Sequence, residues 1–309
     1  MAKRGPSKLN LLLAVDKPVG ITSHDVVARV RRALDERRVG HAGTLDPLAS
    51  GVMIVGVGQA TRLLGMLTLD TKSYIAAIRF GSETNTDDAE GEVIRTAPIA
   101  SELFDEGYAA RAVAATVGAQ EQVPPQFSAI SVNGVRSYKR AREGDSFELP
   151  PRPVEVISAQ LISVVPDGDS PVWNVAYTVS KGTYIRALAR DLGRSLRSAA
   201  HIQDLRRTAS GSISLADCTS LDDLDVESAS AHALDPVAAL GLHSVEVSER
   251  IVPDIRLGRD VHIPEVSSFE MGESLCLVRD GKLLALAHRE KDVFSLDRVF
   301  PEPIAGVDA

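Results

Sequence analysis

A chain of 309 residues with 44% hydrophobic and 25% charged residues has the composition of a globular protein with a sizeable core, and its length suggests about two domains. No apolar run approaches the ~20 residues needed to span a membrane, and Cys218 and Cys276 lack metal or redox spacing. The short apolar run at residues 11–15 is followed by no small-residue cleavage site, so it predicts a buried strand rather than a signal peptide. We therefore expect a cytoplasmic protein, with a monomer as the default state.

Charge is distributed unevenly along the chain. The net charge of −8 argues against a nucleic-acid partner, but residues 211–309 carry 8 Lys and Arg against 19 Asp and Glu, while the first 210 residues carry 26 against 23. The basic residues of that first part form three clusters: Arg29, Arg31, Arg32, Arg37 and Arg38; Arg136, Lys139, Arg140 and Arg142; and Lys181, Arg186, Arg190, Arg194, Arg197, Arg206 and Arg207. Phosphate binding needs a local basic surface rather than a basic protein. One cluster is typical of a solvated helix face, whereas three clusters around one candidate site favour nucleic-acid binding.

Hydrophobic periodicity predicts helices and strands in irregular alternation. The first part should contain a strand at 11–15, a helix at 24–34 capped by Ser23, a strand at 51–58, a helix at 59–69, a strand at 73–80, a polar loop at 82–97 and a helix at 101–117. Prolines bracket residues 122–153, whose basic and polar interior predicts an inserted mobile arm. Paired strands at 154–165 and 172–179, a helix at 183–196 and a strand at 201–208 should follow.

This order lacks the regular period of a doubly wound sheet and shows no internal repeat. It favours an α+β domain with a mixed sheet over residues 10–240. Beyond the acidic stretch at 222–227, short apolar runs at 273–278, 283–287 and 293–299 surround the hairpin signal Asp280-Gly281. They predict a small β domain over residues 245–309.

The string HAGTLDPLASG at residues 41–51 is the most informative stretch. Gly43 and Gly51 permit backbone geometry that other residues resist, and Pro47 disfavours a helical backbone at Asp46. The string predicts a rigid loop that presents the carboxylate of Asp46 with His41 nearby. An Asp-Pro pair by itself is typical of a polar turn.

Together with the string SKGTYIR at residues 180–186, this loop resembles the active-site motif of the TruB family of tRNA pseudouridine synthases, and the resemblance is strong over residues 10–210 and weak beyond. The resemblance implies an isomerase with an α+β, mixed-sheet catalytic domain, an RNA-binding thumb arm at 122–153 and a PUA-like C-terminal domain. It also implies that the substrate is tRNA, at the T-loop uridine numbered 55 in tRNA. Such a reaction breaks the bond from uracil N1 to the ribose and remakes it from C5, so it needs no metal or other cofactor.

Three catalytic residues follow from the resemblance. Asp46 would be the nucleophile, with attack on C6 of the base or on C1′ of the ribose left open. Arg186 would pair with Asp46, lower its pKa and keep it ionised. Tyr74 would stack on the uracil and accept the proton from C5. The competing interpretations are an exposed arginine at a helix start for Arg186 and a core tyrosine for Tyr74.

Further residues are assigned to substrate binding by the same resemblance. His41 would enter the RNA loop and fill the space that the flipped base leaves. Tyr184 and Leu205 would wall the pocket, although both also suit a core position. Lys17, in a Lys-Pro motif, would support the wall of the site; the competing interpretation is a strand-to-turn exit.

Two polar segments also match the family. In the arm, Arg136, Lys139 and Arg140 would grip phosphates of the T-arm. Thr84, Thr86, Asp88 and Gly91 match a TxTxDxxG-like pattern. That pattern fits either a loop that contacts RNA or a plain turn.

Two functional hypotheses remain. The first is the pseudouridine synthase, and the alternative is a non-catalytic tRNA-binding folding chaperone on the same scaffold. The joint presence of Asp46, Tyr74 and Arg186 favours the enzyme, because binding alone does not require an aspartate that faces RNA. The GxGxxT string at residues 56–61 lacks the third glycine of a dinucleotide fingerprint, and the sequence has no Walker A, HExxH or CxxC string.

Overall fold

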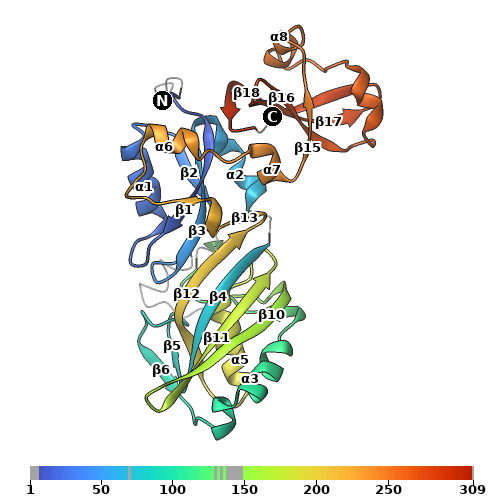
Figure 1. The fold of residues 1–309 in the computed structure, drawn as a ribbon. Coiled ribbons are helices and arrows are strands. Elements are labelled where there is room, and N and C mark those ends of the chain that lie inside the picture. The colour runs from blue at the N-terminus through green and yellow to red at the C-terminus, as the bar shows by residue number, and fades with distance from the viewer. Residues whose placement is uncertain (1–6, 69–70, 129–130, 133–134, 137–148, 308–309) are drawn as a thin grey trace.

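The computed structural model describes residues 7–68, 71–128, 131–132, 135–136 and 149–307. Figure 1 shows an elongated molecule in which a large twisted sheet runs along the body and a second, smaller sheet lies at one end. Within the described residues no helix is both long and apolar enough to cross a membrane. The mixed sheets and few helices confirm the predicted α+β class.

The large sheet is mixed. Its strands run in the order β14 (Cys218–Thr219), β1 (Leu11–Lys17), β3 (Ser50–Val57), β12 (Ala200–Ser210), β4 (Lys72–Phe80), β11 (Ser170–Val179), β10 (Arg152–Asp167) and β7 (Gly118–Gln122), while β2 (Val39–Ala42) pairs with β3 and β13 (Ile213–Ser214) pairs with β12. The β1–β14 and β3–β12 pairs are parallel, and the other pairs are antiparallel. β3 is buried at all of its positions, because it lies in the interior of the sheet with both faces covered.

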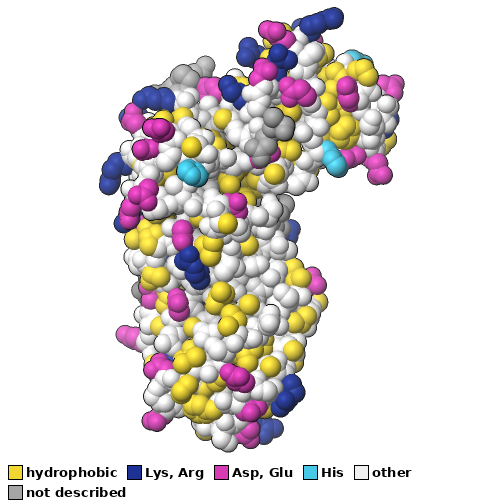
Figure 2. Space-filling view, viewed as in Figure 1, with side chains coloured by type: hydrophobic (Ala, Val, Ile, Leu, Met, Phe, Trp, Pro, Cys, Tyr) yellow, Lys and Arg dark blue, Asp and Glu magenta, His cyan; other side chains and the backbone are white. Residues whose placement is uncertain are grey.

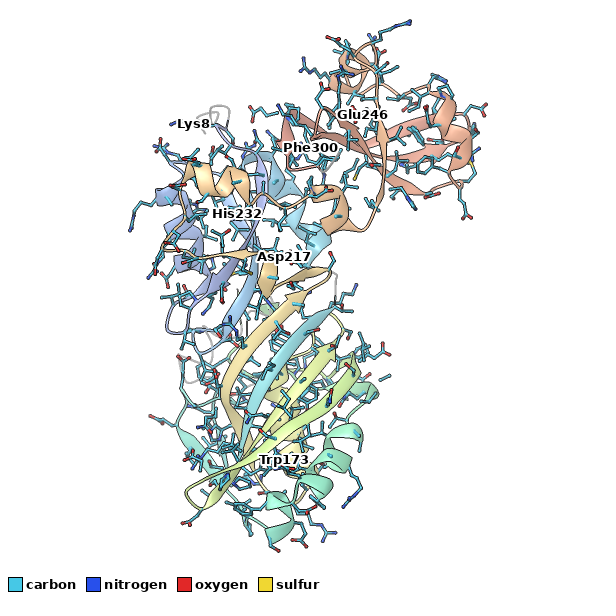
Figure 3. The ribbon with its side chains drawn as sticks, viewed as in Figure 1. Lys8, Trp173, Asp217, His232, Glu246 and Phe300 are labelled. Carbon is cyan, nitrogen blue, oxygen red and sulfur yellow. The ribbon has the colours of Figure 1, made fainter. Side chains whose placement is uncertain are left out.

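Helices cover this sheet at separate places. The longer ones are α1 (Ser23–Ala33), α3 (Glu106–Ala114) and α5 (Ile185–Ser195), and the shorter ones are α2 (Leu64–Leu67), α6 (Val226–Ala231), α7 (Pro236–Leu240) and α8 (Val252–Arg256), with 3₁₀ turns at Gly58–Arg62, Ser101–Phe104, Leu215–Asp217 and Pro264–Ser268. α3 and α5 share one core with β4, β11 and β12, in which Trp173 Nε1 donates to Leu103 O at 2.8 Å (Figure 3). α1 packs a second core against β1 and β3.

Four predicted elements need correction. The helix at 59–69 is a 3₁₀ turn followed by the single turn α2, and the helix at 101–117 is likewise a 3₁₀ turn followed by the shorter α3. The polar loop at 82–97 contains a hairpin of β5 (Ser82–Thr84) and β6 (Val93–Thr96). The N-cap of α1 is Thr22 rather than Ser23, because Thr22 forms a reciprocal capping box with Asp25. The Ser23 side chain is buried and takes another partner.

The smaller sheet contains β15 (His243–Glu246), β16 (Ser274–Arg279), β17 (Lys282–Glu290) and β18 (Val293–Ala305) in that order. Asp280 and Gly281 have φ of 49° and 68° between β16 and β17, which confirms the predicted hairpin turn. Phe300 (Figure 3) shares a core with residues of β1 and β3, and the Arg62 guanidinium lies 5.2 Å from its ring centroid. The smaller sheet is therefore packed onto the body, and the division near residue 240 and its PUA-like character stay predictions.

Candidate active site

The loop between β2 and β3, residues 43–49, is fixed from three sides by buried polar side chains. Lys17 Nζ donates to the carbonyls of Ala49 at 2.6 Å, Pro18 at 2.9 Å and Pro47 at 3.4 Å. Ser23 Oγ donates to Leu45 O and accepts from Leu45 N, each at 2.9 Å. Arg207 on β12 donates through Nη2 to Gly43 O at 3.1 Å. We define residues 43–49 as the motif loop, which these bonds hold rigidly.

The two glycines at the ends of this region adopt the backbone that the sequence predicts. Gly43 has φ of 74° and Gly51 has φ of 106°, a region that side chains disfavour. Gly51 also lies directly against Arg207 in the parallel β3–β12 pair, and a Cβ at Gly51 would come within 2.1 Å of Arg207 O. Close approach of the two strands thus depends on the missing side chain.

Asp46 and Arg186 meet, although they are far apart in the sequence. Arg186 Nη2 lies 2.9 Å from Asp46 Oδ2. Arg186 is 4% exposed at the start of α5, and its guanidinium also donates to the carbonyls of Thr86 at 2.6 Å and Phe127 at 3.0 Å. These bonds leave the guanidinium one orientation, with one edge toward the carboxylate. The exposed-arginine interpretation is therefore wrong.

Asp88 is the residue that sequence reasoning left unassigned. Its Oδ2 lies 3.4 Å from Arg186 Nη1, so Arg186 contacts two carboxylates. Thr86 Oγ1 donates to Asp88 Oδ1 at 2.6 Å and Thr84 Oγ1 donates to Asp88 O at 2.6 Å. The TxTxDxxG-like pattern therefore builds an internal turn that presents Asp88 to Arg186. Its spacing was the available signal, and only the fold shows which side chain it orients.

Opposing effects act on the pKa of Asp46. Burial raises the pKa of Asp46, and the nearby charge of Arg186 only partly opposes this effect, while Asp88 adds to the increase. The side chain keeps 39% exposure toward the cavity, yet protein surrounds it on the other sides and limits its hydration. Arg186 thus lowers the pKa of Asp46 as predicted, but desolvation outweighs the ion pair and leaves that pKa above its usual value.

A cavity of about 550 Å³ opens in front of Asp46. Four other predicted site residues line it: Tyr74, Tyr184, Arg186 and Leu205. Tyr74 on β4 and Leu205 on β12 are 8% and 6% exposed, so each also belongs to the core that the sequence offered as the alternative. The side-chain amide of Gln122 bonds both backbone groups of Tyr184, at 2.8 and 3.1 Å. The cavity is therefore walled by aromatic and aliphatic groups around one carboxylate.

Two predicted residues stand outside the lining of this cavity. Lys17 lies behind the motif loop and is fully buried, and that burial lowers its pKa to about 8. His41 is half-buried on β2, with its ring edge-to-face with His24 at 5.8 Å between centroids. Burial also lowers the pKa of His41, so its neutral form is favoured. Within the described part of the chain its buried Nδ1 has no hydrogen-bond partner.

The three basic clusters differ in how far their side chains are paired or exposed. In the third cluster most arginines are used internally: Arg190 pairs with Asp87 at 2.8 Å, Arg194 with Glu83 at 2.6 Å and Arg206 with Asp16 at 2.6 Å, and Arg207 is 1% exposed. Carboxylates from β1 and the β5 region therefore neutralise Arg190, Arg194 and Arg206, which leaves less of this cluster for phosphates than the sequence suggests. The first cluster remains on the surface. The arm residues Lys139 and Arg140 lie outside the described residues, as does the side chain of Arg136.

The geometry suits nucleophilic chemistry on a planar base. A carboxylate held at the bottom of a cavity can attack an electrophilic carbon, and flat apolar walls can hold an extruded base by stacking. In the described residues no group of three or more His, Cys, Asp or Glu side chains is placed to hold a metal ion.

Comparison with known proteins identifies the family. The model of the TruB family pseudouridylate synthase N-terminal domain matches residues 31–185, and that of the tRNA pseudouridylate synthase B C-terminal domain matches residues 186–239. The chain is 46% identical over 249 residues to tRNA pseudouridine synthase B of Mycobacteroides abscessus, covering 80% of this chain and 83% of that protein. It is 44% identical over 283 residues to tRNA pseudouridine synthase B of Thermobifida fusca, covering 89% and 93%.

Solved structures show the same fold. The chain is similar to one in the crystal structure of a Cbf5-Nop10-Gar1 complex, with a TM-score of 0.65, 23% identity and coverage of 94% of this chain and 84% of that one. It is also similar to a chain of an H/ACA RNP bound to a substrate RNA containing 2′-deoxyuridine, with a TM-score of 0.64, 22% identity and the same coverages. Since the two family models together span residues 31–239 and curated relatives match over most of its length, the chain belongs to the TruB family of pseudouridylate synthases.

Proposed function

We propose that this chain isomerises the T-loop uridine of tRNA, position 55, to pseudouridine with Asp46 as the nucleophile. The observation that carries this proposal is the 2.9 Å pair of Asp46 and Arg186 at the cavity. The names of the relatives, tRNA pseudouridine synthase B, support the tRNA substrate. The expected cytoplasmic location and monomeric state belong to the same proposal, as does the division into domains at 10–240 and 245–309.

The reaction begins with extrusion of the uridine. A base must leave its stack before the cavity can hold it, and this costs a few kcal/mol. His41, near the end of β2, fills the vacated space in the RNA loop, and its neutral ring stacks without repelling Arg207. Tyr74 and Leu205 then enclose the uracil from two sides, with Tyr184 at the wall.

The chemical step uses the carboxylate. Asp46 attacks the bound nucleoside, at C6 of the uracil or at C1′ of the ribose, and the bond from N1 to C1′ breaks. The base rotates, C5 bonds to C1′, and the carboxylate leaves. The proton on C5 passes to an acceptor, for which Tyr74 lies at the cavity wall, and N1 takes up a proton from solvent. No atom is gained or lost overall, so the chain needs to supply only positioning, a nucleophile and a proton acceptor.

Arg186 orients the nucleophile and offsets part of the cost of ionising it. Lys17 holds the motif loop from behind rather than touching the base, since its Nζ is committed to two loop carbonyls and to the carbonyl of Pro18. The arm residues Arg136, Lys139 and Arg140 are proposed to hold T-arm phosphates.

The test is tritium release from C5-labelled uridine in unmodified tRNA by the wild-type chain and by Asp46→Asn. We expect release by the wild type and none by the variant, with tRNA affinity unchanged within about twofold, because Asn keeps the shape of the side chain. Release by neither chain, with RNA still bound, would favour the folding chaperone. Equal release by both would mean that another group is the nucleophile.

A further inference from the structure

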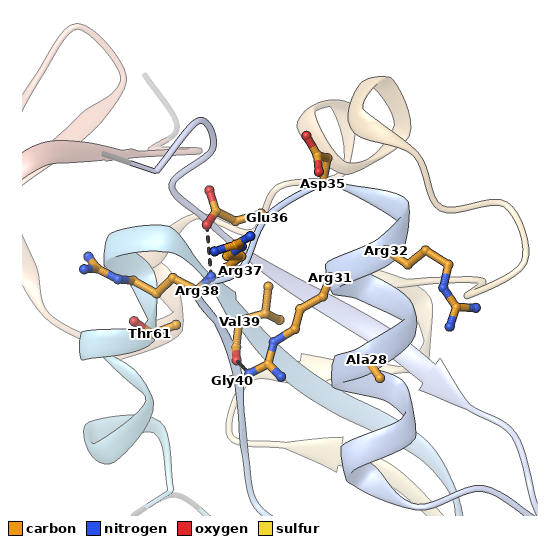
Figure 4. A pocket seen from close by; sticks show the side chains of 10 residues that line it. All are labelled: Ala28, Arg31, Arg32, Asp35, Glu36, Arg37, Arg38, Val39, Gly40 and Thr61. Atoms are coloured by element: carbon orange, nitrogen blue, oxygen red, sulfur yellow. Dashed lines mark hydrogen bonds between the residues drawn. The ribbon is translucent and has the colours of Figure 1, made fainter. Parts of the chain in front are cut away.

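A second hollow, of about 790 Å³, lies where β2 begins (Figure 4). Its lining includes Arg31 and Arg32 from the last turn of α1 and Arg37 and Arg38 from the connection to β2. Resting on the proposed function, we propose that this hollow binds the sugar-phosphate backbone of the same RNA whose uridine enters the active-site cavity. We call it the α1–β2 hollow.

The two carboxylates in the lining already have other partners. Lys8 Nζ pairs with Asp35 Oδ2 at 2.6 Å on the exposed surface. Glu36 is 7% exposed and accepts hydrogen bonds from the backbone amides of Lys8 at 3.0 Å and Arg38 at 2.9 Å. Figure 4 shows the Glu36 carboxylate turned to the Arg38 amide. Neither carboxylate forms an ion pair with an arginine of the hollow.

The arginines therefore keep their charge for a ligand. Among the guanidinium groups of these four arginines, that of Arg31 alone has a hydrogen bond to another described residue, by donation from Nη2 to Val39 O at 2.9 Å. Within the described ranges no carboxylate lies within ion-pair distance of Arg32, Arg37 or Arg38. Figure 2 shows basic side chains along the edge of the molecule formed by α1. This contrasts with Arg190, Arg194 and Arg206 of the third basic cluster, which pair with carboxylates.

The chemistry of the α1–β2 hollow fits phosphodiester groups of RNA. Arginine guanidinium groups match phosphate oxygens in charge and geometry. The hollow is much larger than one inorganic phosphate requires, and it is open to solvent rather than enclosed, so it suits a passing backbone. Backbone contacts of this kind position an RNA without reading its sequence.

The α1–β2 hollow lies close enough to the active-site cavity to contact the same RNA molecule. Val39 and Gly40 of β2 line the hollow, and Gly43, Thr44 and Asp46, just after β2, line the active-site cavity. A four-residue strand spans on the order of 13 Å. A hairpin whose loop lies at Asp46 can therefore pass its phosphates over Arg37 and Arg38 without a second RNA molecule.

The test compares Arg37→Gln/Arg38→Gln with the matched control Arg250→Gln/Arg256→Gln. The control removes two exposed arginines of the C-terminal part, far along the chain from the hollow. We measure the Kd for a T-arm hairpin from low to high salt and the single-turnover rate at saturating RNA. The hollow variant should bind about tenfold more weakly at low salt, with a salt slope smaller by about 2. Its bound-state rate should equal that of the wild type, and the control should behave as the wild type throughout.

If the two double variants had the same Kd for the hairpin and the same salt slope, the inference would be overturned. Tritium release by both variants would then show that the proposed function still holds. A hollow variant that keeps its RNA affinity but loses binding of inorganic phosphate, followed by ³¹P NMR line width, would assign the hollow to a small phosphate compound and also overturn it. If the wild type bound the hairpin with the expected arginine dependence but released no tritium, the proposed function would fail and the hollow would remain. Melting temperatures of both variants identify any loss of folding.

Discussion

The Ser23 hydroxyl holds both backbone groups of Leu45, donating to its carbonyl and accepting from its amide at 2.9 Å each. Leu45 directly precedes Asp46, so this contact fixes the backbone from which the carboxylate projects. Ser23 is 1% exposed and lies in the first turn of α1, which packs on β1 and β3. The position of the carboxylate is thus tied to the core of the N-terminal part through one hydroxyl group.

Replacement of Ser23 by alanine should slow the reaction without weakening RNA binding. The change leaves both backbone groups of Leu45 without their buried partner, so the motif loop shifts, and misplacement of a reacting group by about 1 Å can cost about 10²-fold in rate. We expect the single-turnover rate of tritium release to fall about 10- to 100-fold. The Kd for tRNA should stay within about twofold of the wild-type value, because no phosphate contact is removed.

A buried serine elsewhere provides the control for Ser23→Ala. Ser198 is also 1% exposed and donates to the carbonyl of Pro98 at 2.9 Å, at the other end of α5 from Arg186. Ser198→Ala should lower stability by about 1–3 kcal/mol without slowing the bound-state reaction. Equal rate losses in the two variants would show that Ser23 acts only through general stability.

The local parts of the fold could be predicted from the sequence. Alternating and continuous apolar runs placed β1, β4, β11 and three strands of the smaller sheet, β16 to β18, and the Asp280-Gly281 turn signal placed the hairpin. Local patterns failed where tertiary contacts decide the outcome. β2 was missed because its four residues lack a pattern of their own and become a strand only by pairing with β3.

The candidate site was predicted from matching strings rather than from physical reasoning on the residues alone. Nothing in residues 41–51 indicates that Arg186 lies beside Asp46, since that proximity depends on how α5 packs against the motif loop. The roles of Ser23 and Asp88 were missed because each has a plausible local function, as a helix cap and as a turn residue. Only the fold shows that both side chains face the site.

Loss of Arg186 should raise the pKa of Asp46 further. The charge of Arg186 opposes the effect of burial, so Arg186→Gln removes the main group that favours the ionised carboxylate. The reaction needs that ionised form, so activity is present above the pKa of Asp46 and is lost as pH falls through it. We expect the acid limb of the rate profile to move to higher pH and the maximal rate to fall at least ~10²-fold. Carboxyl ¹³C NMR measures the pKa of Asp46 without needing activity, with the Asp46 signal assigned by its loss in Asp46→Asn. The same titration in the wild type and in Arg186→Gln would contradict the prediction.

Asp88→Asn should move the same titration the other way. The negative charge of Asp88 adds to the raised pKa of Asp46, so its neutral isostere lowers that pKa and moves the acid limb to lower pH. Asn keeps an acceptor for Thr86 and Arg186, so the turn should persist. The exposed Asp167, which pairs with Arg79, supplies a charge-matched control as Asp167→Asn. A shift of equal size in this control would indicate a general effect of net charge.

The stability of the fold should decrease as pH rises from about 4 to about 6, because of Asp87. Burial raises the pKa of Asp87 from 3.8 to about 6, even though Arg190 lies 2.8 Å away. Because the pKa of Asp87 is higher in the folded chain than in the unfolded chain, the folded chain holds this proton more tightly. The contribution of Asp87 to the free energy of unfolding is therefore full below pH 3.8 and is lost as pH rises through about 6. Relative to Asp87→Asn, the wild type should lose on the order of 3 kcal/mol across this window. Denaturant unfolding of both chains at several pH values measures the difference, which would stay constant if the pKa of Asp87 were ordinary.

Gly51→Ala should damage the site from the strand behind it. A methyl group at Gly51 would come within 2.1 Å of Arg207 O, and φ of 106° is itself unfavourable for alanine. β3 and β12 must therefore separate, which pulls Arg207 from the carbonyls of Val52 and Gly43 and loosens the motif loop. We expect a stability loss of at least ~2 kcal/mol, with a large fall in the tritium-release rate.

Gly168→Ala is the control. Gly168 also has a positive φ, of 62°, but a Cβ there meets nothing within 4 Å, so this variant isolates the cost of the backbone alone. It should cost about 1 kcal/mol and leave the rate unchanged; equal losses in the two variants would mean that the contact between β3 and β12 is less tight than 2.1 Å implies.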